Sequence, residues 1–542
     1  MIREGREGIQ MKIEKLLQEM SVEEMVGQLL CFNVPPEMTE EDFEAVIERT
    51  KPGGIFVKDY EMPQVGKFQA MMKKYCRLPG LIAADLETGP KSANDGETMP
   101  NAMAQGACGD TALLHKLHKS RAEACRKAGV SLVFSPVVDI NINPDNPVTN
   151  VRSFSDSADH VIKMAETWVR AFQEDGLVMT TCKHFPGDGT DDRNQHFCTT
   201  INRLTADEWM ESFGKVYKAM IKAETAAIMV GHISLPALQD SAEYDESFGY
   251  LPGTLSYSLQ TKLLKERLGF GGCIISDAMS MVGACAAIPI DRLAIEFLKA
   301  GGDMLLYPLP EDYDRILEAV RTGEISMERL RDAAGRVLRL KEKARLFEKE
   351  EDVQKDIREE YDSKALTAEV GEKCIKIVRN RQGLVPLQLP EKAKILLINI
   401  AAVNDEIGLP VLEEELAKRG YTVKTLLNPR HYTVQEEIPN YDCVLVNCKI
   451  TSYNYPGGSL RIGWDQVWPF WRGYIFTHPC MIFTSFGDPY KIYDFPYLRT
   501  YINAFSEAEG VQRGFVRVLL GEAEPTAKSP VTLKGFFERE VQ

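Results

Sequence analysis

The chain has 542 residues, 44% hydrophobic and 26% charged, which is enough apolar sequence to bury a large core without disulfides or a metal. This length exceeds one ordinary domain and suits a barrel of about 250 residues or more with a second domain. The formal net charge of −15 argues against nucleic acid or an anionic membrane as the principal partner, because both bind basic surfaces.

The cysteines and the N-terminus indicate the compartment. The 12 cysteines are scattered without a CxxC pair, so we expect free thiols in a reducing environment and no metal site. The N-terminal segment is charged and lacks the apolar core of a signal peptide, and no stretch has the roughly 18 apolar residues of a membrane span. The sequence therefore predicts a cytoplasmic protein.

Eight apolar runs alternate with amphipathic helical stretches over the first two thirds of the chain. Most runs are continuously apolar, which is typical of parallel strands covered on both faces. The predicted strands are 27–33, 54–57, 81–84, 132–139, 177–184, 227–233, 272–277 and 303–307. The clearest helices are 111–128, 157–175, 205–223 and 258–267. This alternation predicts a TIM-like (β/α)8 barrel over residues 11–345.

Beyond the barrel, the chain changes character twice. Residues 346–390 are rich in charge, and we expect a helical linker whose charged side chains face solvent. From residue 391, apolar runs such as AKILLINI alternate with helical segments such as VLEEELAKRGY, which predicts a smaller, open α/β-sandwich domain over 391–542. This domain has neither a GxGxxG nor a Walker A loop, so we expect no nucleotide and no other cofactor.

Polar residues interrupt the apolar pattern of the barrel where the predicted strands end. They are Asp85, Asp139, Lys183, His184, His232 and Asp277. In a barrel the C-terminal ends of the strands form the active-site face, and charged residues scattered through a core would not respect strand ends. The coincidence predicts one polar site at the mouth of the barrel.

The segment CKHFPGDGTDDRNQHFCTTIN (182–202) is the densest cluster of polar residues. Lys183 and His184 end a predicted strand, and the prolines and glycines after them force an irregular loop. The loop carries Asp188, Asp191, Asp192, Asn194 and His196. It is either an ordinary solvent loop or a device that delivers His196 to a ligand held by Lys183 and His184.

A second segment, GGCIISDAMSM, places Asp277 directly after an apolar run. A carboxylate is expensive to bury there without partners, so Asp277 is either a nucleophile or ligand-binding acid, or it caps the following helix. Asp85 and Asp139 stand at the ends of other predicted strands, and Arg152 lies in a loop rich in proline and asparagine. These three are able to bind a ligand or to belong to structural ion pairs.

Together these motifs resemble glycoside hydrolase family 3, in particular its bacterial β-N-acetylglucosaminidases of the NagZ type, in a two-domain form. The resemblance rests on KHFPGDG followed by a histidine, SDAMSM, PVVDININP with VRSF, and the opening SVEEMVGQLL, in the family's order. TSFGDPYKIYDFP and SPVTL extend it into the C-terminal domain. It implies a retaining hydrolase that removes terminal β-linked N-acetylhexosamine from small oligosaccharides or glycopeptides, for example in cell-wall recycling.

The resemblance also implies residue roles. Asp277 matches the catalytic nucleophile, and His196 matches an acid/base on a mobile loop. The residues that match groups gripping the sugar are Asp85, Arg152, Lys183, His184 and His232. Asp188 stands where the family signature has a histidine, and Asn194 stands where it has the aspartate that pairs with the acid/base. We expect Asp188, Asn194 and Asp192 to modulate the loop.

In the implied mechanism Asp277 forms a glycosyl–enzyme intermediate, while His196 protonates the leaving oxygen and later activates water. Asn194 still accepts the imidazole N–H but adds no negative charge, and a neighbouring acidic residue of the loop could supply one. Three alternatives remain open: a β-glucosidase or β-xylosidase of the same superfamily, a glycoside phosphorylase, and a weakly active sugar-binding homologue.

Overall fold

The computed structural model describes residues 12–35, 37–58, 60, 62–88, 98–401, 408–450, 462 and 467–541. They form two compact units, one made of residues up to 96, 118–139 and 165–361, the other of 97–117, 140–164 and 362–542. The second unit thus takes in two segments from the first third of the chain, whereas the sequence predicts contiguous domains. The predicted domain limits stay a prediction.

Eight parallel strands form the sheet of the first unit. They are β1 (Leu30–Val34), β2 (Gly54–Val57), β3 (Leu81–Ala84), β4 (Leu132–Val133), β5 (Met179–Phe185), β7 (Ala227–Val230), β11 (Cys273–Ser276) and β12 (Leu305–Leu306). Each strand pairs with the next in this order, β12 returns to pair with β1, and a single bridge between Ile275 and Met304 connects β11 with the start of β12. The sheet is a nearly closed barrel, which confirms the predicted fold.

Burial on both faces explains why these residues form strands. All four residues of β2, β3, β7 and β11 are buried, as expected for parallel strands with side chains inside the barrel and helices outside. Inside the barrel, Phe56 and Phe134 stack with their ring centroids 5.5 Å apart and share a core cluster with Leu81 and Met179.

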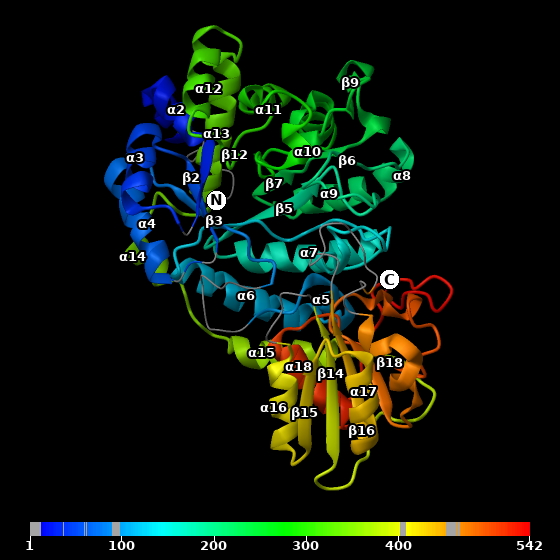
Figure 1. Ribbon diagram of the computed structural model, residues 1–542. Helices are drawn as coiled ribbons and strands as arrows, with labels where there is room; N and C mark the ends of the chain where they lie inside the picture. The colour runs from blue at the N-terminus through cyan, green and yellow to red at the C-terminus, as the bar shows by residue number, and fades with distance from the viewer. Residues whose placement is uncertain are drawn as a thin grey trace. The chain divides into compact units, whose positions relative to one another are not determined.

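Helices connect the strands of the barrel (Figure 1). They are α2 (Val22–Gln28), α3 (Glu40–Thr50), α4 (Met62–Tyr75), α6 (Thr111–Lys127), α7 (Ala158–Gln173), α8 (Ala206–Glu211), α9 (Phe213–Lys222), the π-helix η5 (Ser258–Arg267), α11 (Leu293–Ala300), α12 (Asp312–Arg321) and α13 (Met327–Lys343). The division between the two compact units falls within α6 and within α7.

One predicted helix, 205–223, is two helices in the structure, α8 and α9. Thr205 caps α8 in a capping box with Glu208. From α8 the Trp209 indole donates a hydrogen bond of 2.8 Å to the Pro186 carbonyl. The separate first helix therefore anchors the turn at the end of β5, where the dense polar loop begins.

A six-stranded sheet forms the second unit (Figure 1). In spatial order its strands are β13 (Lys376–Asn380), β18 (Thr500–Asn503), β17 (Met481–Ser485), β16 (Cys443–Lys449), β14 (Lys394–Ala401) and β15 (Thr422–Leu427). Five strands are parallel in the order 2-1-3-4-5 of flavodoxin-like sheets, and β13 is antiparallel at one edge. The helices of this unit are α5 (Ala102–Cys108), α15 (Ser363–Lys373), α16 (Pro410–Lys418), α17 (His431–Glu437) and α18 (Glu509–Leu519). This sheet confirms the predicted second α/β domain.

The segment predicted as a helical linker, 346–390, is not helical throughout. It contains α14 (Glu350–Gln354) and α15, and then the strand β13. Ile377 and Val378 of β13 are only partly buried against the core of the second unit. This half-exposed edge strand has only two apolar residues, between Lys376 and Arg379, which is too short a run for the sequence pattern to reveal it.

Two findings bear on the predicted compartment. All 12 cysteines are free. In the described part of the chain, every helix is too short or too polar to cross a membrane.

Candidate active site

The polar residues predicted at the strand ends lie at one mouth of the barrel. Asp85 follows β3, Lys183 and His184 are near the end of β5, His232 follows β7, and Asp277 follows β11. Because parallel strands of a barrel all direct their C-terminal ends to the same side, these residues share one rim. Their contacts connect them into two clusters, one around Lys183 and one around Asp277.

Lys183 lies between two carboxylates. Its Nζ is 2.6 Å from Asp85 Oδ1 and 2.7 Å from Glu87 Oε1, and its side chain is only 3% exposed. The two acids stabilise a nearly buried ammonium, and the Asp85 side chain stays 43% exposed, so it can still accept from a ligand hydroxyl. The sequence prediction missed Glu87, although its spacing of two residues from Asp85 was an available signal.

His184 is oriented by a buried carboxylate. Its Nδ1 lies 2.7 Å from Asp139 Oδ2, while Asp139 Oδ1 accepts from the backbone N–H groups of His184 and Asp188 at 3.1 and 2.8 Å. An Nδ1–H donor to Asp139 leaves Nε2 as the nitrogen that can face a ligand. Asp139, which the sequence left between ligand binding and a structural ion pair, therefore positions other residues. Asp188 is buried and shapes the turn, accepting from the Gly189 N–H.

Asp277 is held at the end of β11 by its backbone. Its N–H donates to the Val230 carbonyl at 2.9 Å, and its Oδ1 accepts from the Ala278 N–H at 2.8 Å. Burial opposes ionisation, but the His184 imidazole, the Ala278 N–H and the Lys183 ammonium outweigh it and lower the Asp277 pKa. Asp277 is thus an ionised carboxylate at neutral pH, as a nucleophile must be.

His232 connects two other parts of the site. Its Nε2 is 3.0 Å from the Ala278 carbonyl and its Nδ1 is 3.0 Å from Thr254 Oγ1. The carbonyl requires a donor, so Nε2 carries the proton and Nδ1 accepts from the threonine. Burial lowers the pKa of His232, which keeps the ring neutral. With both ring nitrogens bound to protein groups, we interpret His232 as a positioning residue beside Asp277.

The loop after β5 is stabilised by a buried acid. Asp191 accepts from Arg193 Nη2 at 2.6 Å and from the Ile201 N–H at 2.7 Å. Burial alone would raise the pKa of Asp191, but the hydrogen bonds from Arg193 and Ile201 lower it to about 2. Asp191 is committed to these contacts, and Asp192 next to it is exposed.

Asn194 takes the place expected for the partner of the acid/base. Its Oδ1 accepts from the His196 N–H at 3.0 Å and lies 2.7 Å from His196 Nδ1. The amide oxygen therefore selects the tautomer with the proton on Nδ1, so Nε2 is the nitrogen available for proton transfer. The substitution preserves the orientation of the imidazole and removes the negative charge.

Arg152 belongs to the second compact unit. It ends a short 3-10 turn (Asn150–Arg152), and its Nη1 donates to the Val148 carbonyl at 3.1 Å. Its side chain is partly exposed. The sugar-binding role that the sequence gives Arg152 stays a prediction.

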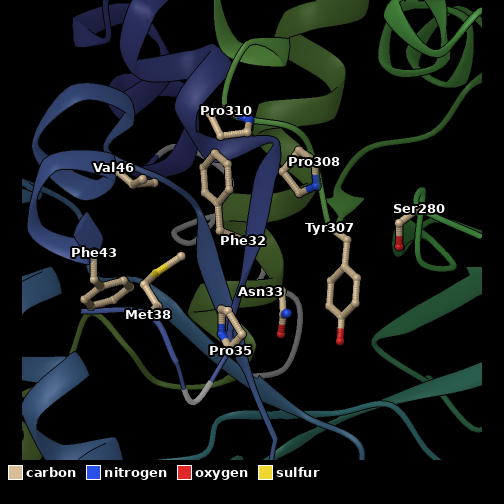
Figure 2. Close-up of a pocket in the computed structure, with 10 residues that line it drawn as sticks. All are labelled: Phe32, Asn33, Pro35, Met38, Phe43, Val46, Ser280, Tyr307, Pro308 and Pro310. Atoms are coloured by element: carbon tan, nitrogen blue, oxygen red, sulfur yellow. The ribbon is translucent and has the colours of Figure 1, made fainter. Parts of the chain in front are cut away.

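An apolar pocket of about 260 Å³ opens at the same end of the barrel, next to the strands β12 and β1 (Figure 2). It is lined by Phe32, Asn33, Pro35, Met38, Phe43, Val46, Ser280, Tyr307, Pro308 and Pro310. Burial raises the pKa of the Tyr307 hydroxyl, and the charges of Asp85 and Asp277 add to the increase. The sequence prediction missed Tyr307, which directly follows a strand of only two residues.

The barrel and its mouth define an enzyme class that combines an ionised strand-end aspartate with an exposed, oriented histidine on a loop. In the described part of the chain, no group of three His, Cys, Asp or Glu side chains could hold a metal ion. The chain belongs to glycosyl hydrolase family 3, because residues 21–340 match the description "Glycosyl hydrolase family 3 N terminal domain".

Relatives extend the similarity over the whole chain. A protein of Cellulomonas fimi called beta-N-acetylglucosaminidase/beta-glucosidase is 29% identical over 96% of this chain and 95% of its own. Beta-hexosaminidase A of Pseudoalteromonas piscicida is 28% identical over 57% of this chain and 56% of its own. The solved structure of beta-glucoside phosphorylase BglX bound to 2FGlc has a TM-score of 0.87 and 28% identity, covering 97% of each chain. These similarities confirm the family predicted from the motifs.

Proposed function

We propose that this protein is a retaining glycoside hydrolase that releases terminal β-linked N-acetylhexosamine through a covalent glycosyl–Asp277 intermediate. One observation carries the proposal: the backbone N–H of Val282, five residues after Asp277, donates to the His196 carbonyl at 3.2 Å. The loop with the candidate acid/base is therefore attached to the segment that follows the candidate nucleophile. The names of the curated relatives support the choice of N-acetylhexosamine.

In the proposed reaction, His196 starts as the imidazolium, with protons on both ring nitrogens. An Asp277 oxygen attacks the anomeric carbon as the glycosidic bond breaks, and the Nε2 proton of His196 moves to the leaving oxygen. His196 Nε2 then takes a proton from water, whose oxygen displaces the Asp277 carboxylate and releases the sugar. Lys183, Asp85 and the Nε2 of His184 would bind sugar hydroxyls. Asn194 holds Nδ1–H throughout both steps.

The test compares aryl β-N-acetylglucosaminides with aryl β-glucosides under identical conditions. We expect a higher kcat/KM for the N-acetylated sugar. A 2-fluoro glycoside of the preferred sugar should label Asp277, with the mass increase located by peptide mass spectrometry. A preference for the glucoside would show that the enzyme is a β-glucosidase and not an N-acetylhexosaminidase. If an active enzyme carried no label on Asp277, the assignment of Asp277 as the nucleophile would be wrong.

A glycoside phosphorylase is the second candidate. The structural similarity to beta-glucoside phosphorylase BglX and the neutral Asn194 favour it, because the amide puts no second anion beside the acceptor site. In that reaction a phosphate oxygen attacks the anomeric carbon of the intermediate and the ester bond to Asp277 breaks. Phosphorus NMR of the products decides: a sugar 1-phosphate supports the phosphorylase, and free sugar alone in the presence of phosphate excludes it.

For its biological setting we propose the cytoplasm and small cell-wall fragments as substrates. The 12 free thiols support a reducing compartment. Muropeptide fragments with terminal N-acetylglucosamine and chitin oligosaccharides are the substrates to compare. If the enzyme released N-acetylglucosamine from the chitin oligosaccharide and not from the muropeptide fragment, the cell-wall assignment would be wrong.

A further inference from the structure

Gln195, the residue directly before His196, is buried although its neighbour is exposed. Its side chain is 1% exposed, and its Oε1 accepts from the backbone N–H of His232 at 2.9 Å. A Cβ atom at Gly231 would lie 2.9 Å from the same Oε1. The amide thus occupies a slot after β7 that exists because residue 231 has no side chain.

The backbone around Gln195 is attached to the segment that follows Asp277. A Cβ atom at Gly283 would lie 2.4 Å from the Gln195 carbonyl oxygen, so the two backbones are in close contact. Thr199 Oγ1, three residues after His196, donates to the Gly283 carbonyl at 2.8 Å. The Gln195 side chain adds a further contact, because its amide oxygen accepts from the His232 N–H at the end of β7.

A continuous path connects Gln195 with Asp277. The His232 N–H donates to Gln195, the His232 ring donates to the Ala278 carbonyl, and the Ala278 N–H donates to the Asp277 carboxylate. Asn194 contacts His196 within the loop and sets only the orientation of the ring. Placement of the loop relative to the nucleophile depends on contacts outside the loop. The Val282 N–H and the Gly283 carbonyl hold the loop at His196 and Thr199, and the Gln195 amide adds a contact to His232.

We propose that Gln195 is a positioning residue that sets the distance between the His196 imidazole and the Asp277 carboxylate. The inference rests on the proposed function. Displacements of about 1 Å in a catalytic group cost about 100-fold in rate. The His196 side chain is exposed, so its position depends on how the backbone of the loop is held.

The test exploits the dependence of the first step on proton donation. A phenyl glycoside needs the acid, whereas a 2,4-dinitrophenyl glycoside leaves without a proton, and kcat/KM reports this first step for both. For Gln195→Ala we expect kcat/KM to fall about 10- to 100-fold with the phenyl substrate and less than about 3-fold with the dinitrophenyl substrate. Equal losses with both substrates, or no loss with either, would overturn the proposal.

Two controls separate positioning from a general structural role. Gln239→Ala removes a side-chain amide that accepts from the Leu235 N–H at 2.7 Å, outside residues 190–199, and should leave kcat/KM unchanged for both substrates. Gln195→Met keeps the length of the side chain without the acceptor and should behave like Gln195→Ala. If Gln195→Met kept the wild-type ratio of the two kcat/KM values, the size of the side chain and not its hydrogen bond would matter. That result would overturn the proposal.

A readout independent of catalysis is hydrogen exchange of residues 190–199. We expect faster exchange there in Gln195→Ala and unchanged exchange in the strands β5 and β11. His196→Ala, assayed with the same two glycosides, separates this inference from the proposed function. If His196→Ala shows no dependence on the leaving group, the assigned acid/base is wrong; if it does and Gln195→Ala does not, only the role of Gln195 is wrong.

Discussion

The strand ends and the loop after β5 hold their reactive groups in different ways. Asp277 and His184 are fixed by backbone bonds of the barrel and by a fully buried carboxylate. His196 is exposed and depends on Asn194 and on a few contacts of its loop. The position of the nucleophile is therefore fixed by the barrel itself, whereas the position of the acid/base depends on the conformation of its loop.

The largest expected effect is the loss of activity in Asp277→Ala. The variant removes the nucleophile, and we expect kcat to fall by about 10³-fold or more, as for other enzymes that lose the nucleophile. Steady-state hydrolysis of the preferred aryl glycoside measures it, with circular dichroism as the control for folding. A rate within tenfold of wild type would remove Asp277 from the mechanism.

The next effect separates the two regions by stability. Asp139→Ala leaves His184 and two backbone N–H groups without their buried acceptor, and we expect a loss of about 3–5 kcal/mol in the free energy of unfolding. Asn194→Ala, on the exposed loop, should change the free energy of unfolding by less than about 0.5 kcal/mol while lowering kcat. Urea denaturation of both variants measures the two changes. Similar losses in the free energy of unfolding would show that the two regions do not differ in this way.

A smaller change restores the charge beside the acid/base. Asn194→Asp puts a carboxylate next to His196 Nδ1, where it stabilises the protonated ring. We expect about a tenfold rise in kcat for hydrolysis and a shift of the alkaline limb of the pH–rate profile to higher pH. A large drop in hydrolysis on this change would mean that the loop is adapted to the neutral amide, as for the phosphorylase alternative.

The smallest effect concerns the opposite end of the barrel, at Lys341. Burial lowers the pKa of Lys341 to about 7 from 10.5, and its Nζ donates to Gln28 Oε1 at 2.5 Å. Between pH 7 and 10.5 the unfolded chain binds the additional proton, so the destabilisation is complete below pH 7 and decreases as the pH rises. Lys341→Met should therefore stabilise the protein by about 1–3 kcal/mol at pH 6 and by less at pH 9. At both pH values the Gln28 side chain loses its donor, which offsets part of the gain.

Thermal and urea unfolding at both pH values measure this gain. Gln28→Leu combined with Lys341→Met should increase it by removing the unpaired acceptor. A gain that does not change with pH would show that Lys341 is not titrating in the folded protein.

The sequence predicted the rim of the site better than the loop. Strands such as β2 and β3 were predicted to the residue because continuous apolar runs have few other uses, and the charged residues that end such runs then fall at one mouth. Gln195 and Tyr307 were missed because their importance arises from contacts between distant segments. A glutamine in a polar loop carries no local signal that its amide is buried.

The interleaved composition of the second unit has a consequence for truncation. Met103, Ala104 and Ala107 of α5, and Val151, belong to the same buried core as the C-terminal sheet. A protein shortened after residue 361 would keep these four side chains and lose the residues that cover them. The barrel of this chain is therefore not an autonomous module, and removing the C-terminal part would invite aggregation before any effect on catalysis could be measured.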